Sequence, residues 1–466
     1  MQIYLGAKTN KKALQNLLQK LGDTPLKFIG TKKSFISYFA MQNIPYILDS
    51  RQATLLHSDF VFLPNQQEKI LCKKHKILFY DPPSQSLIKF LMKSLRFISL
   101  EFLDRLLILF FRKTPTRPQG ILVIRTDAIG DYVLFRNFLK PLYEHYGKIT
   151  LVANIANKDL IESFDMPYID TFIPLQRKAF LNNPFYHFTF LKKIRQKSYA
   201  LLINPLFSRD LVSEQIARFA IATQKITCEG DVSNLSSRLE SYFNSYYTKI
   251  LPSNPKILFE FFRNLEFFEN LLEKKLDTML EMQLKNPQDV LEKFNIQTPY
   301  AVLFIGASTT YRKWSKESFL EIAEFLSKQG FNIVVCGGME DKANADFITH
   351  NLQHSKAYNL CGATSLCEVA KIVYNGNHLL SNETSCVHIA KAIGHDKIFV
   401  VYNGNHFHRF TPYPKGLGGE YYGIYHPIIR KNPNAYAIFS NFLQQSTLNI
   451  HEITPKDVKE VILENL

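Results

Sequence analysis

Hydrophobic and polar positions follow a repeated pattern along most of this chain: a short apolar run and then a longer amphipathic segment. The clearest apolar run is Ile121–Arg125, which predicts a buried strand that leads into a helix beginning near Asp131. Strands that alternate with helices form parallel sheets through crossover connections, so the pattern predicts an α/β fold.

The same pattern recurs on both sides of this segment. Further strands are predicted at residues 3–5, 60–63, 77–80, 149–153, 200–204, 300–305, 331–336, around 358, 378–380 and 397–401. Helices are predicted at residues 316–328, 343–352, 366–373 and 384–393, and residues 250–295 are expected to form charged, phenylalanine-rich helices. The segment Thr454-Pro455-Lys456-Asp457 is a helix-start signal.

Interruptions of the pattern divide the chain into four parts. A proline-containing hinge at residues 114–118 separates an N-terminal α/β extension, residues 1–115, from a first Rossmann-like domain, residues 118–297. A second Rossmann-like domain covers residues 298–432, and a helical tail covers residues 433–466. Because ligands of open α/β sheets bind at the carboxyl ends of the strands, two such domains imply a ligand cleft between them.

The charge of the chain narrows the choice of partner. A formal net charge of +15 suits a polyanionic partner, namely nucleic acid, acidic lipid or a phosphorylated sugar. The basic residues are spread along the chain, and no DNA- or RNA-binding motif is present. No nucleic-acid partner is therefore predicted.

Cysteine usage and apolar stretches bear on localisation. The six cysteines show no CxxC spacing and predict reduced thiols in a cytoplasmic protein. Neither a signal peptide nor an apolar stretch of about 18 residues is found. Residues 87–113 are basic and apolar-rich, which fits a helix lying on an anionic membrane surface, although Glu101 and Asp104 dilute its charge. A buried connecting helix explains the same apolar content equally well.

The turn after the first strand of the first domain carries the leading catalytic candidates. Asp127 and Asp131 flank Gly130 at the carboxyl edge of the predicted sheet, where Gly130 permits a tight turn into the helix. A carboxylate at a cleft edge can take the proton of an attacking hydroxyl. Aspartate is also a favoured helix N-cap, and this segment by itself gives the two interpretations equal weight.

A second candidate segment, Gly306 to Trp314, follows the first strand of the second domain. Its hydroxyls and its cations suit a departing diphosphate, which needs hydrogen bonds and positive charge as the glycosidic bond breaks. Lys313 is the residue expected to supply the charge in place of a metal. The alternative interpretation is a solvated basic loop.

A third candidate segment, Ser381 to His388, runs from a strand end into a helix. Helix-start amides attract phosphate, and Thr384 and Ser385 add hydroxyl donors. The alternative is an ordinary helix start capped by Asn382 or Thr384, with His388 as a packing residue. A weaker signal is the Gly337-Gly338-Met339-Glu340-Asp341 segment, whose glycines and carboxylates suit a ribose.

Several enzyme classes lack their motifs in this chain. No GxxxxGK[ST] loop, HExxH pair or GxSxG elbow occurs. There is also no Asp-x-Asp, the carboxylate pair by which many sugar transferases bind manganese. The sequence therefore predicts an enzyme that uses neither a metal nor a cofactor.

Taken together, these segments resemble the ADP-heptose:lipopolysaccharide heptosyltransferase family (glycosyltransferase family nine), a GT-B group of inverting transferases. The resemblance covers residues 118–466 and depends on segments in that family's order and spacing, at residues 121–135, 308–314, 337–340 and 361–388. It implies two Rossmann-like domains that face a cleft, with the first on the acceptor side and the second binding the donor. The N-terminal extension is not part of the usual family core and is interpreted as an acceptor-recognition or docking module.

The resemblance also assigns roles to residues. The family's catalytic base falls on Asp131, with Asp127 as a neighbour that could share the role. Its phosphate-binding loop falls on Thr309, Thr310 and Lys313, and the segment Gly337, Gly338 and Glu340 would contact the donor. Its second donor motif, Asp-(Ser/Thr)-Gly-x-x-His, falls on Glu383, Thr384, Ser385 and His388.

This last match departs from the family pattern twice. Glu383 replaces the usual Asp and Ser385 the usual Gly, which changes the room beside the donor. The donor sugar therefore stays open, with ADP-heptose as the first expectation.

The sequence thus predicts an inverting glycosyltransferase that moves a sugar from a nucleotide donor to a lipopolysaccharide or related lipid-linked glycan, at the cytoplasmic face of a bacterial inner membrane. Two alternatives remain. A sugar-nucleotide epimerase on the same architecture would form product from the donor alone. A non-catalytic scaffold for polysaccharide assembly, with its donor site altered at Glu383 and Ser385, would bind no nucleotide sugar.

Overall fold

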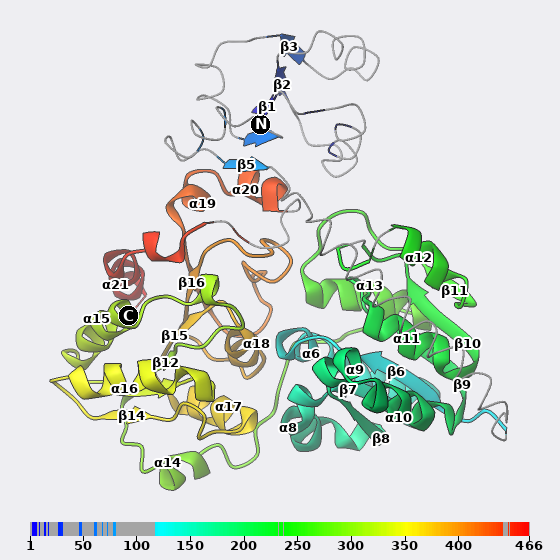
Figure 1. Ribbon diagram of the computed structural model, residues 1–466. Helices are drawn as coiled ribbons and strands as arrows, with labels where there is room; N and C mark the ends of the chain where they lie inside the picture. The colour runs from blue at the N-terminus through cyan, green and yellow to red at the C-terminus, as the bar shows by residue number, and fades with distance from the viewer. Residues whose placement is uncertain are drawn as a thin grey trace.

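The computed structural model describes residues 2–6, 9, 14, 17, 27–30, 46–48, 60–62, 68, 72, 78–80, 117–231, 233–235, 237–440, 446 and 448–465. These residues form three separate parallel β-sheets; in Figure 1 the N-terminal sheet lies at the top, the second at the lower right and the third at the lower left. The predicted basic helix at residues 87–113 lies outside the described residues. Within the described parts, no helix is long and apolar enough to cross a bilayer.

The N-terminal sheet has the strand order β3-β2-β1-β4-β5, with every neighbouring pair parallel. Its strands are β1 (Gln2–Leu5), β2 (Lys27–Gly30), β3 (Tyr46–Leu48), β4 (Phe60–Phe62) and β5 (Leu78–Tyr80). Strand β5 contacts helix α20 (Pro433–Ser440), so the predicted C-terminal tail joins the N-terminal sheet to the rest of the molecule (Figure 1).

The second sheet has the order β11-β10-β9-β6-β7-β8. Its strands are β6 (Ile121–Arg125), β7 (Ile149–Asn154), β8 (Ile169–Leu175), β9 (Ser198–Asn204), β10 (Ile221–Cys228) and β11 (Lys249–Leu251). Every residue of β6 is buried, as expected for a central parallel strand covered on both faces. Strands β8, β10 and β11 were not predicted, because polar and partly exposed positions interrupt their apolar runs.

Helices cover this sheet, and two of them begin at side-chain caps. The main ones are α6 (Ile129–Val133), α7 (Leu139–Tyr146), α9 (Arg177–Asn182), α10 (Pro184–Arg195), α11 (Leu211–Phe219) and α13 (Glu260–Leu272). Asn183 and Asp210 accept backbone N–H bonds at the starts of α10 and α11.

The prediction of helices throughout residues 250–295 is wrong for residues 250–259 and 274–288. Helix α13 ends at Glu273, which adopts a left-handed conformation, and the following chain is irregular up to α14 (Asp289–Lys293). This stretch is rich in charged residues, as a surface helix is, but it lacks the apolar stripe that such a helix needs in order to pack.

The third sheet has the order β14-β13-β12-β15-β16-β17. Its strands are β12 (Tyr300–Phe304), β13 (Asn332–Cys336), β14 (Ala357–Asn359), β15 (His378–Asn382), β16 (Ile398–Tyr402) and β17 (Tyr421–Tyr425). It is covered by α15 (Lys316–Ser327), α16 (Lys342–Asn351), α17 (Leu366–Asn375), α18 (Ser385–Ala392) and α21 (Pro455–Glu464). The sequence predicted all of these strands except β17, whose positions are mostly half-buried.

The predicted helix start at Thr454 is present as a capping box with Asp457. Helix α21 packs on α15 and β17, so the end of the chain belongs to the layers of the third sheet.

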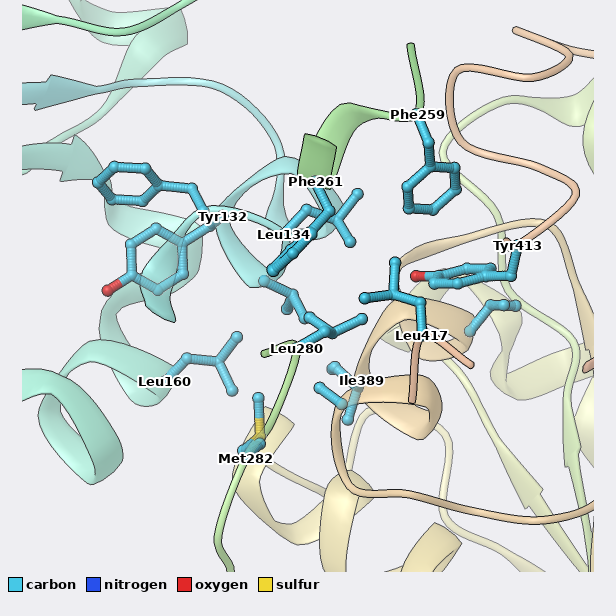
Figure 2. Close-up of a cluster of buried hydrophobic side chains, with 14 of the residues drawn as sticks. Tyr132, Leu134, Leu160, Phe259, Phe261, Leu280, Met282, Ile389, Tyr413 and Leu417 are labelled. Atoms are coloured by element: carbon cyan, nitrogen blue, oxygen red, sulfur yellow. The ribbon is translucent and has the colours of Figure 1, made fainter. Parts of the chain in front are cut away.

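The second and third sheets are joined by a shared apolar core, part of which Figure 2 shows. The rings of Phe259 and Tyr413 lie 4.7 Å apart, and the backbone amide of Met282 donates to the carbonyl of Ala392 at 2.7 Å. Helices α6 and α18 are also in contact. The two Rossmann-like halves are therefore packed against each other, and the start of α6 meets α18 of the other half.

Candidate active site

The turn after β6 is held by a buried arginine. Arg125 is the last residue of β6, and its guanidinium lies 5.0 Å from the centre of the Phe135 ring. The same guanidinium donates to the carbonyl oxygen of Asp131 at 3.0 Å and lies 3.1 Å from the Asp127 carboxylate. One side chain thus holds both predicted carboxylate residues in a single turn.

Neither carboxylate caps the helix. The N-cap residue of α6 is Ala128, and no side chain makes a cap hydrogen bond there. Asp131 lies within the first helical turn, and Asp127 pairs with Arg125. The capping interpretation is therefore wrong for this turn, because neither carboxylate accepts a cap hydrogen bond from the start of the helix.

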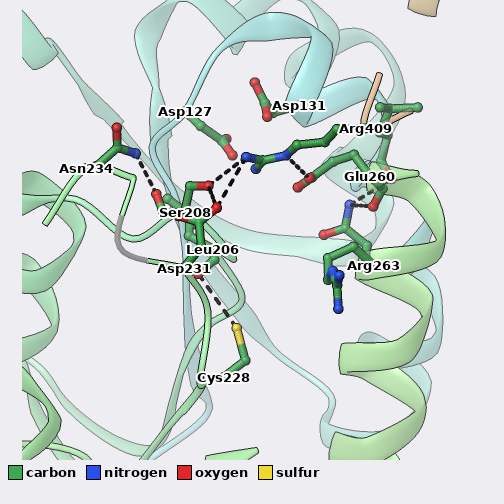
Figure 3. A network of polar contacts seen from close by, with 12 residues as sticks. Asp127, Asp131, Leu206, Ser208, Cys228, Asp231, Asn234, Glu260, Arg263 and Arg409 are labelled. Carbon is green, nitrogen blue, oxygen red and sulfur yellow. Dashed lines mark hydrogen bonds and ion pairs between the residues drawn. The ribbon is translucent and has the colours of Figure 1, made fainter. Parts of the chain in front are cut away.

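A cluster of charged side chains from distant parts of the chain surrounds the turn (Figure 3). Glu260, the first residue of α13, lies 3.5 Å from the Arg125 guanidinium and 3.0 Å from the Nε atom of Arg409. Arg409 comes from the third sheet's half, on the loop after β16. The carboxylate cluster, as we call it, consists of Asp127, Asp131, Asp231 and Glu260.

Burial, together with neighbouring carboxylates, raises the pKa values of the two turn aspartates. Burial raises the pKa of Asp127 to about 8; Arg125 opposes this increase, while Asp131 and Glu260 add to it. Burial and the nearby Glu260 also raise the pKa of Asp131, against the opposing effects of Arg125 and Arg409. A carboxylate whose proton affinity is raised towards neutral pH is suited to act as a general base.

Gly130 has a different function from the one the sequence suggested. Its φ is not positive, so it is not needed for a left-handed turn. A Cβ atom at this position would lie 2.5 Å from the Cδ2 atom of His388, in the other half. Gly130 is therefore required for the close approach of α6 and α18.

His388 lies in this packing contact. It is 4% exposed, and its Nδ1 atom is 2.5 Å from the hydroxyl of Tyr413. Burial, with a smaller contribution from Arg312, lowers the pKa of His388 to about 3, so the ring is neutral at physiological pH. This position favours the packing interpretation of His388 over direct donor contact.

Replacing Gly130 by alanine should destabilise the protein by about 1–3 kcal/mol, because the new methyl group overpacks against a fixed ring. Urea unfolding of Gly130→Ala measures the cost. The double variant Gly130→Ala/His388→Ala supplies the control, since the alanine should cost almost nothing once the ring is removed. An equal cost in both backgrounds would contradict the assigned contact.

The predicted donor loop after β12 is not a solvated basic loop. The Lys313 ammonium lies 2.5 Å from the carboxylate of Asp341, which is only 2% exposed. The Arg312 guanidinium donates to both the carbonyl and the carboxylate of Glu383. Each cation is thus paired with a buried carboxylate, while Thr309 and Thr310 remain exposed.

Asn382 at the end of β15 anchors this loop. Its side-chain oxygen accepts from the Trp314 backbone amide at 3.0 Å, and its side-chain amide donates to the carbonyl of Ile305 at 2.8 Å. The Trp314 indole N–H donates to the carbonyl of Ile453 at 2.8 Å. Asn382 is therefore not a helix cap, and the single tryptophan is a structural anchor.

The carboxylate of Asp341 lies against the backbone of the glycine segment after β13, Gly337-Gly338. A Cβ atom at Gly306 would lie 2.7 Å from the Oδ2 atom of Asp341, and one at Gly337 would lie 3.0 Å from it. The same oxygen accepts from the Gly338 amide at 3.0 Å. Two strand ends thus approach each other over one carboxylate, while Glu340 is exposed at the surface of the segment.

Thr384 is the N-cap residue of α18, and its side chain makes no cap hydrogen bond. Thr384 and Ser385 are both half-buried, next to the Arg312–Glu383 pair. The structure therefore brings the predicted residues Thr309, Thr310, Lys313, Glu383, Thr384 and Ser385 to the carboxyl edges of the neighbouring strands β12 and β15.

Sequence reasoning missed the partners of the predicted residues. The missed side chains are Arg125, Ser208, Asp231, Glu260 and Arg409, whereas Arg312 and Asp341 belong to predicted segments and only their pairing with Glu383 and Lys313 was not foreseen. Arg125 carries a local signal, a charge at the end of an apolar run, and Asp341 adjoins the glycine pair. Glu260 and Arg409 carry none, because their role depends on contacts over more than a hundred residues of sequence separation.

The structure also bears on metal binding. Among the described residues, no group of three or more His, Cys, Asp or Glu side chains is arranged to hold a metal ion. The cations at the donor edge are the protein's own Arg312 and Lys313.

A comparison with models of protein families finds a match to one family. Residues 187–418 match the model of glycosyltransferase family 9 (heptosyltransferase). Residues 187–418 therefore form a glycosyltransferase family 9 domain. The resemblance drawn from the motifs is thereby confirmed, and with it the assignment to a glycosyltransferase family. The matched segment includes the donor loop and begins after Asp131, so it does not test the base assignment.

One curated relative of this chain is a lipooligosaccharide heptosyltransferase 2 from Haemophilus ducreyi. It is 30% identical over 104 residues, which make up 22% of this chain and 30% of the relative. The match thus spans less than a third of that relative's length.

Solved structures of family 9 proteins share the fold. A family 9 glycosyltransferase from Veillonella parvula has a TM-score of 0.57 and 16% identity, over 76% of this chain and all of its own. The ADP-heptose heptosyltransferase II of E. coli has a TM-score of 0.55 and 16% identity, over 74% of this chain and 99% of its own. The E. coli heptosyltransferase WaaC, solved with ADP, has a TM-score of 0.51 and 18% identity over the same shares. The GT-B fold class is thereby confirmed.

Proposed function

We propose that this protein is an inverting glycosyltransferase that transfers a heptose from ADP-heptose to a hydroxyl group of a lipooligosaccharide or a related lipid-linked surface glycan. One observation carries the proposal. A carboxylate of raised proton affinity, Asp131, belongs to the half that packs, through α6 and α18, against the half that carries the Lys313 loop. Such a transfer needs a general base for the acceptor hydroxyl and a site that binds the leaving group.

In the proposed reaction Asp131 accepts the proton of the acceptor hydroxyl as its oxygen attacks the anomeric carbon of the donor. The bond from that carbon to the diphosphate breaks on the opposite face, which inverts the configuration. Asp127, whose carboxyl group lies 3.1 Å from the Arg125 guanidinium, would act as a secondary proton acceptor only above its raised pKa of about 8. Removal of the hydroxyl proton makes the attacking oxygen more nucleophilic in the transition state.

The departing diphosphate would be held by Lys313, Thr309, Thr310 and the amides of Thr384 and Ser385. An ammonium group has three donors, so the bond from Lys313 to Asp341 leaves two for phosphate oxygens. Its charge compensates the charge that develops on the leaving group. Gly337, Gly338 and Glu340 would contact the nucleoside ribose, since they lie at the next strand end.

The Arg312–Glu383 pair bears on the choice of donor. The glutamate side chain is longer than the aspartate of the family pattern, and its carboxylate is engaged by Arg312. Its negative charge is therefore balanced and would not repel the diphosphate. This pairing supports a donor site that works with the substituted motif, which speaks against the scaffold interpretation.

The acceptor would lie over the second sheet's half. A cavity of about 360 Å³ opens there, lined by Ile155, Pro174, Gln176, Tyr186, Thr189, Phe190 and Lys193. It adjoins the catalytic turn, because Asn154, next to Ile155, donates to the carbonyl of Asp127 at 3.1 Å. A cavity with apolar walls and one ammonium suits an acidic sugar of a lipid-linked glycan.

Lys193→Ala is expected to raise the KM for the acceptor by roughly 5-fold, equivalent to ~1 kcal/mol, and to leave the donor KM unchanged. Lys192→Ala removes the same charge from the same helix without touching the cavity and should leave both values unchanged. Steady-state transfer assays with each substrate varied in turn would measure the effect. Equal changes in both variants would assign the effect to net charge alone.

The function is tested by a calorimetric screen of ADP-, UDP-, GDP- and CMP-sugars, followed by transfer from ADP-heptose to lipooligosaccharide isolated from a heptose-deficient strain. The expected result is selective binding of ADP-heptose and a product with inverted anomeric configuration. Conversion of the donor without an acceptor would identify an epimerase. Absence of binding to every nucleotide sugar would identify a scaffold.

A further inference from the structure

One loop crosses from the third sheet's half into the carboxylate cluster of the other half. This crossing loop, residues 403–413, follows β16 and carries Arg409. The backbone carbonyl of Arg409 accepts from the Glu260 amide at 2.8 Å, which fixes the loop to the start of α13. The loop is therefore joined to the opposite half by main chain as well as by side chain.

The Arg409 side chain makes all of its ionic contacts in that opposite half. Its Nε atom donates to Glu260 at 3.0 Å, and its Nη1 atom donates to the hydroxyl of Ser208 at 2.7 Å. The same Nη1 atom lies 3.7 Å from the Asp231 carboxylate. Figure 3 shows the guanidinium between Ser208 and Glu260, on the side of the cluster where Asp127 and Asp131 lie.

The backbone of the crossing loop is built to present this side chain. The residues on both sides of Phe407 are histidines with left-handed backbone conformations, His406 at φ 52° and His408 at φ 64°. Non-glycine residues adopt this conformation uncommonly, and they keep it where the surrounding contacts determine it. Here the hydrogen bond from the His408 amide to the carbonyl of Thr411, at 2.6 Å, closes the loop beside Arg409.

We propose that Arg409 is a positioning residue for the catalytic base: its contacts with Glu260, Ser208 and Asp231 hold a positive charge beside Asp131 only when the two halves are docked. The proposal is based on the proposed function, because it assigns Asp131 as the base. It makes the ionisation of the base in one half depend on a loop of the other half.

The charged groups around Asp131 explain why the Arg409 guanidinium affects the pKa of Asp131. The groups that face it are Arg125 and Asp127 from the end of β6, Glu260 from α13, and Arg409 from the crossing loop. Glu260 raises the pKa of Asp131, while Arg125 and Arg409 lower it. His406 adds no charge at neutral pH, because burial and the nearby arginines lower its pKa to about 4.

The sign of the expected pH effect follows from these directions. Asp131 works as a base in its ionised form, so turnover is lost as the pH falls through its pKa. Removing Arg409 removes one of the charges that lower this pKa. The acid limb of the kcat profile should therefore move to higher pH, by about one pH unit or more.

The test compares Arg409→Gln with Arg409→Lys and with the control Arg430→Gln, which removes an arginine from the distant pair with Asp457. Arg409→Gln should lower kcat at pH 6 by at least 10-fold more than at pH 8.5, with the donor KM little changed. Arg409→Lys should restore part of the shift, and Arg430→Gln should leave the profile unchanged. Thermal unfolding of each variant reports whether it is folded.

A second measurement needs no turnover. In protein labelled with [γ-13C]aspartate, the carboxyl resonance of Asp131 is assigned by its absence in Asp131→Asn, and its pH titration should move upward in Arg409→Gln. An unmoved titration overturns the role of Arg409, whatever the donor is. Full activity of Asp131→Asn would instead overturn the base assignment, so the two failures are distinguishable.

Discussion

Asp131→Asn is expected to lower the turnover number by ~10²–10⁴-fold while donor affinity changes little, which is the usual contribution of a general base. The amide has nearly the same size as the carboxylate but cannot accept a proton. Because Arg125 binds the backbone carbonyl of Asp131 rather than its carboxylate, the turn should keep its geometry in the variant. Steady-state transfer assays and calorimetric titration with ADP give the two quantities separately.

Asp127→Asn provides the matched comparison. Since burial and its acidic neighbours raise the pKa of Asp127 to about 8, this residue is largely protonated at neutral pH. Its amide variant resembles that state and should retain most of the turnover at pH 7. A loss in Asp127→Asn as large as that in Asp131→Asn would show that the two carboxylates act as one base, and a larger loss would move the base to Asp127.

Lys313→Met should produce the second large effect, a fall in kcat/KM of ~10²–10³-fold, as expected when one preorganised donor to a developing negative charge is removed. Methionine keeps the aliphatic bulk of the side chain and removes its charge. ADP should also bind more weakly, because in the proposed complex the Lys313 ammonium contacts the diphosphate in the ground state as well. Transfer kinetics and calorimetric titration with ADP measure both effects.

Lys316→Met is the control for this change. Lys316 begins α15 three residues further along the chain, and its ammonium lies 4.3 Å from the centre of the Phe347 ring, which belongs to α16. Loss of its charge should leave ADP binding and kcat/KM within about 2-fold of the unmodified protein, an allowance of ~0.4 kcal/mol. If both variants lost activity equally, the effect would come from the general positive field of the loop and not from Lys313.

The proposed donor site shows that the geometry of a local motif depends on side chains from other strand ends. Thr309, Thr310 and Lys313 could be predicted to form a diphosphate-binding loop from their position after a strand. The Asp341 carboxylate that orients Lys313 and lies beneath Gly306 and Gly337 belongs to the following strand end. It could not be assigned from spacing, because only the parallel pairing of β12 with β13 brings the two loops together.

His388 and Gly130 show the same limit across the two halves. The order of segments identified both residues, and it attributed Gly130 to a tight turn and His388 to the donor. Their contact over the α6–α18 interface assigns a different role to the glycine, namely space for the imidazole ring. Such a contact depends on how the two halves pack. The hydrophobic pattern of either segment therefore cannot predict it.

The sequence by itself determined the α/β architecture and those strands of the two Rossmann-like domains that are covered on both faces, because buried parallel strands produce continuous apolar runs. It also determined the position of the carboxylate turn at Asp131, because this turn directly follows one of these apolar runs. It did not predict β8, β10, β11 and β17, whose half-exposed positions break those runs. Only the tertiary structure decided which charges surround the proposed base, Asp131. Arg125, Glu260 and Arg409 come from a strand end, a helix start and a loop of the other half, and their effect on Asp131 depends on distances of a few ångströms that only packing establishes.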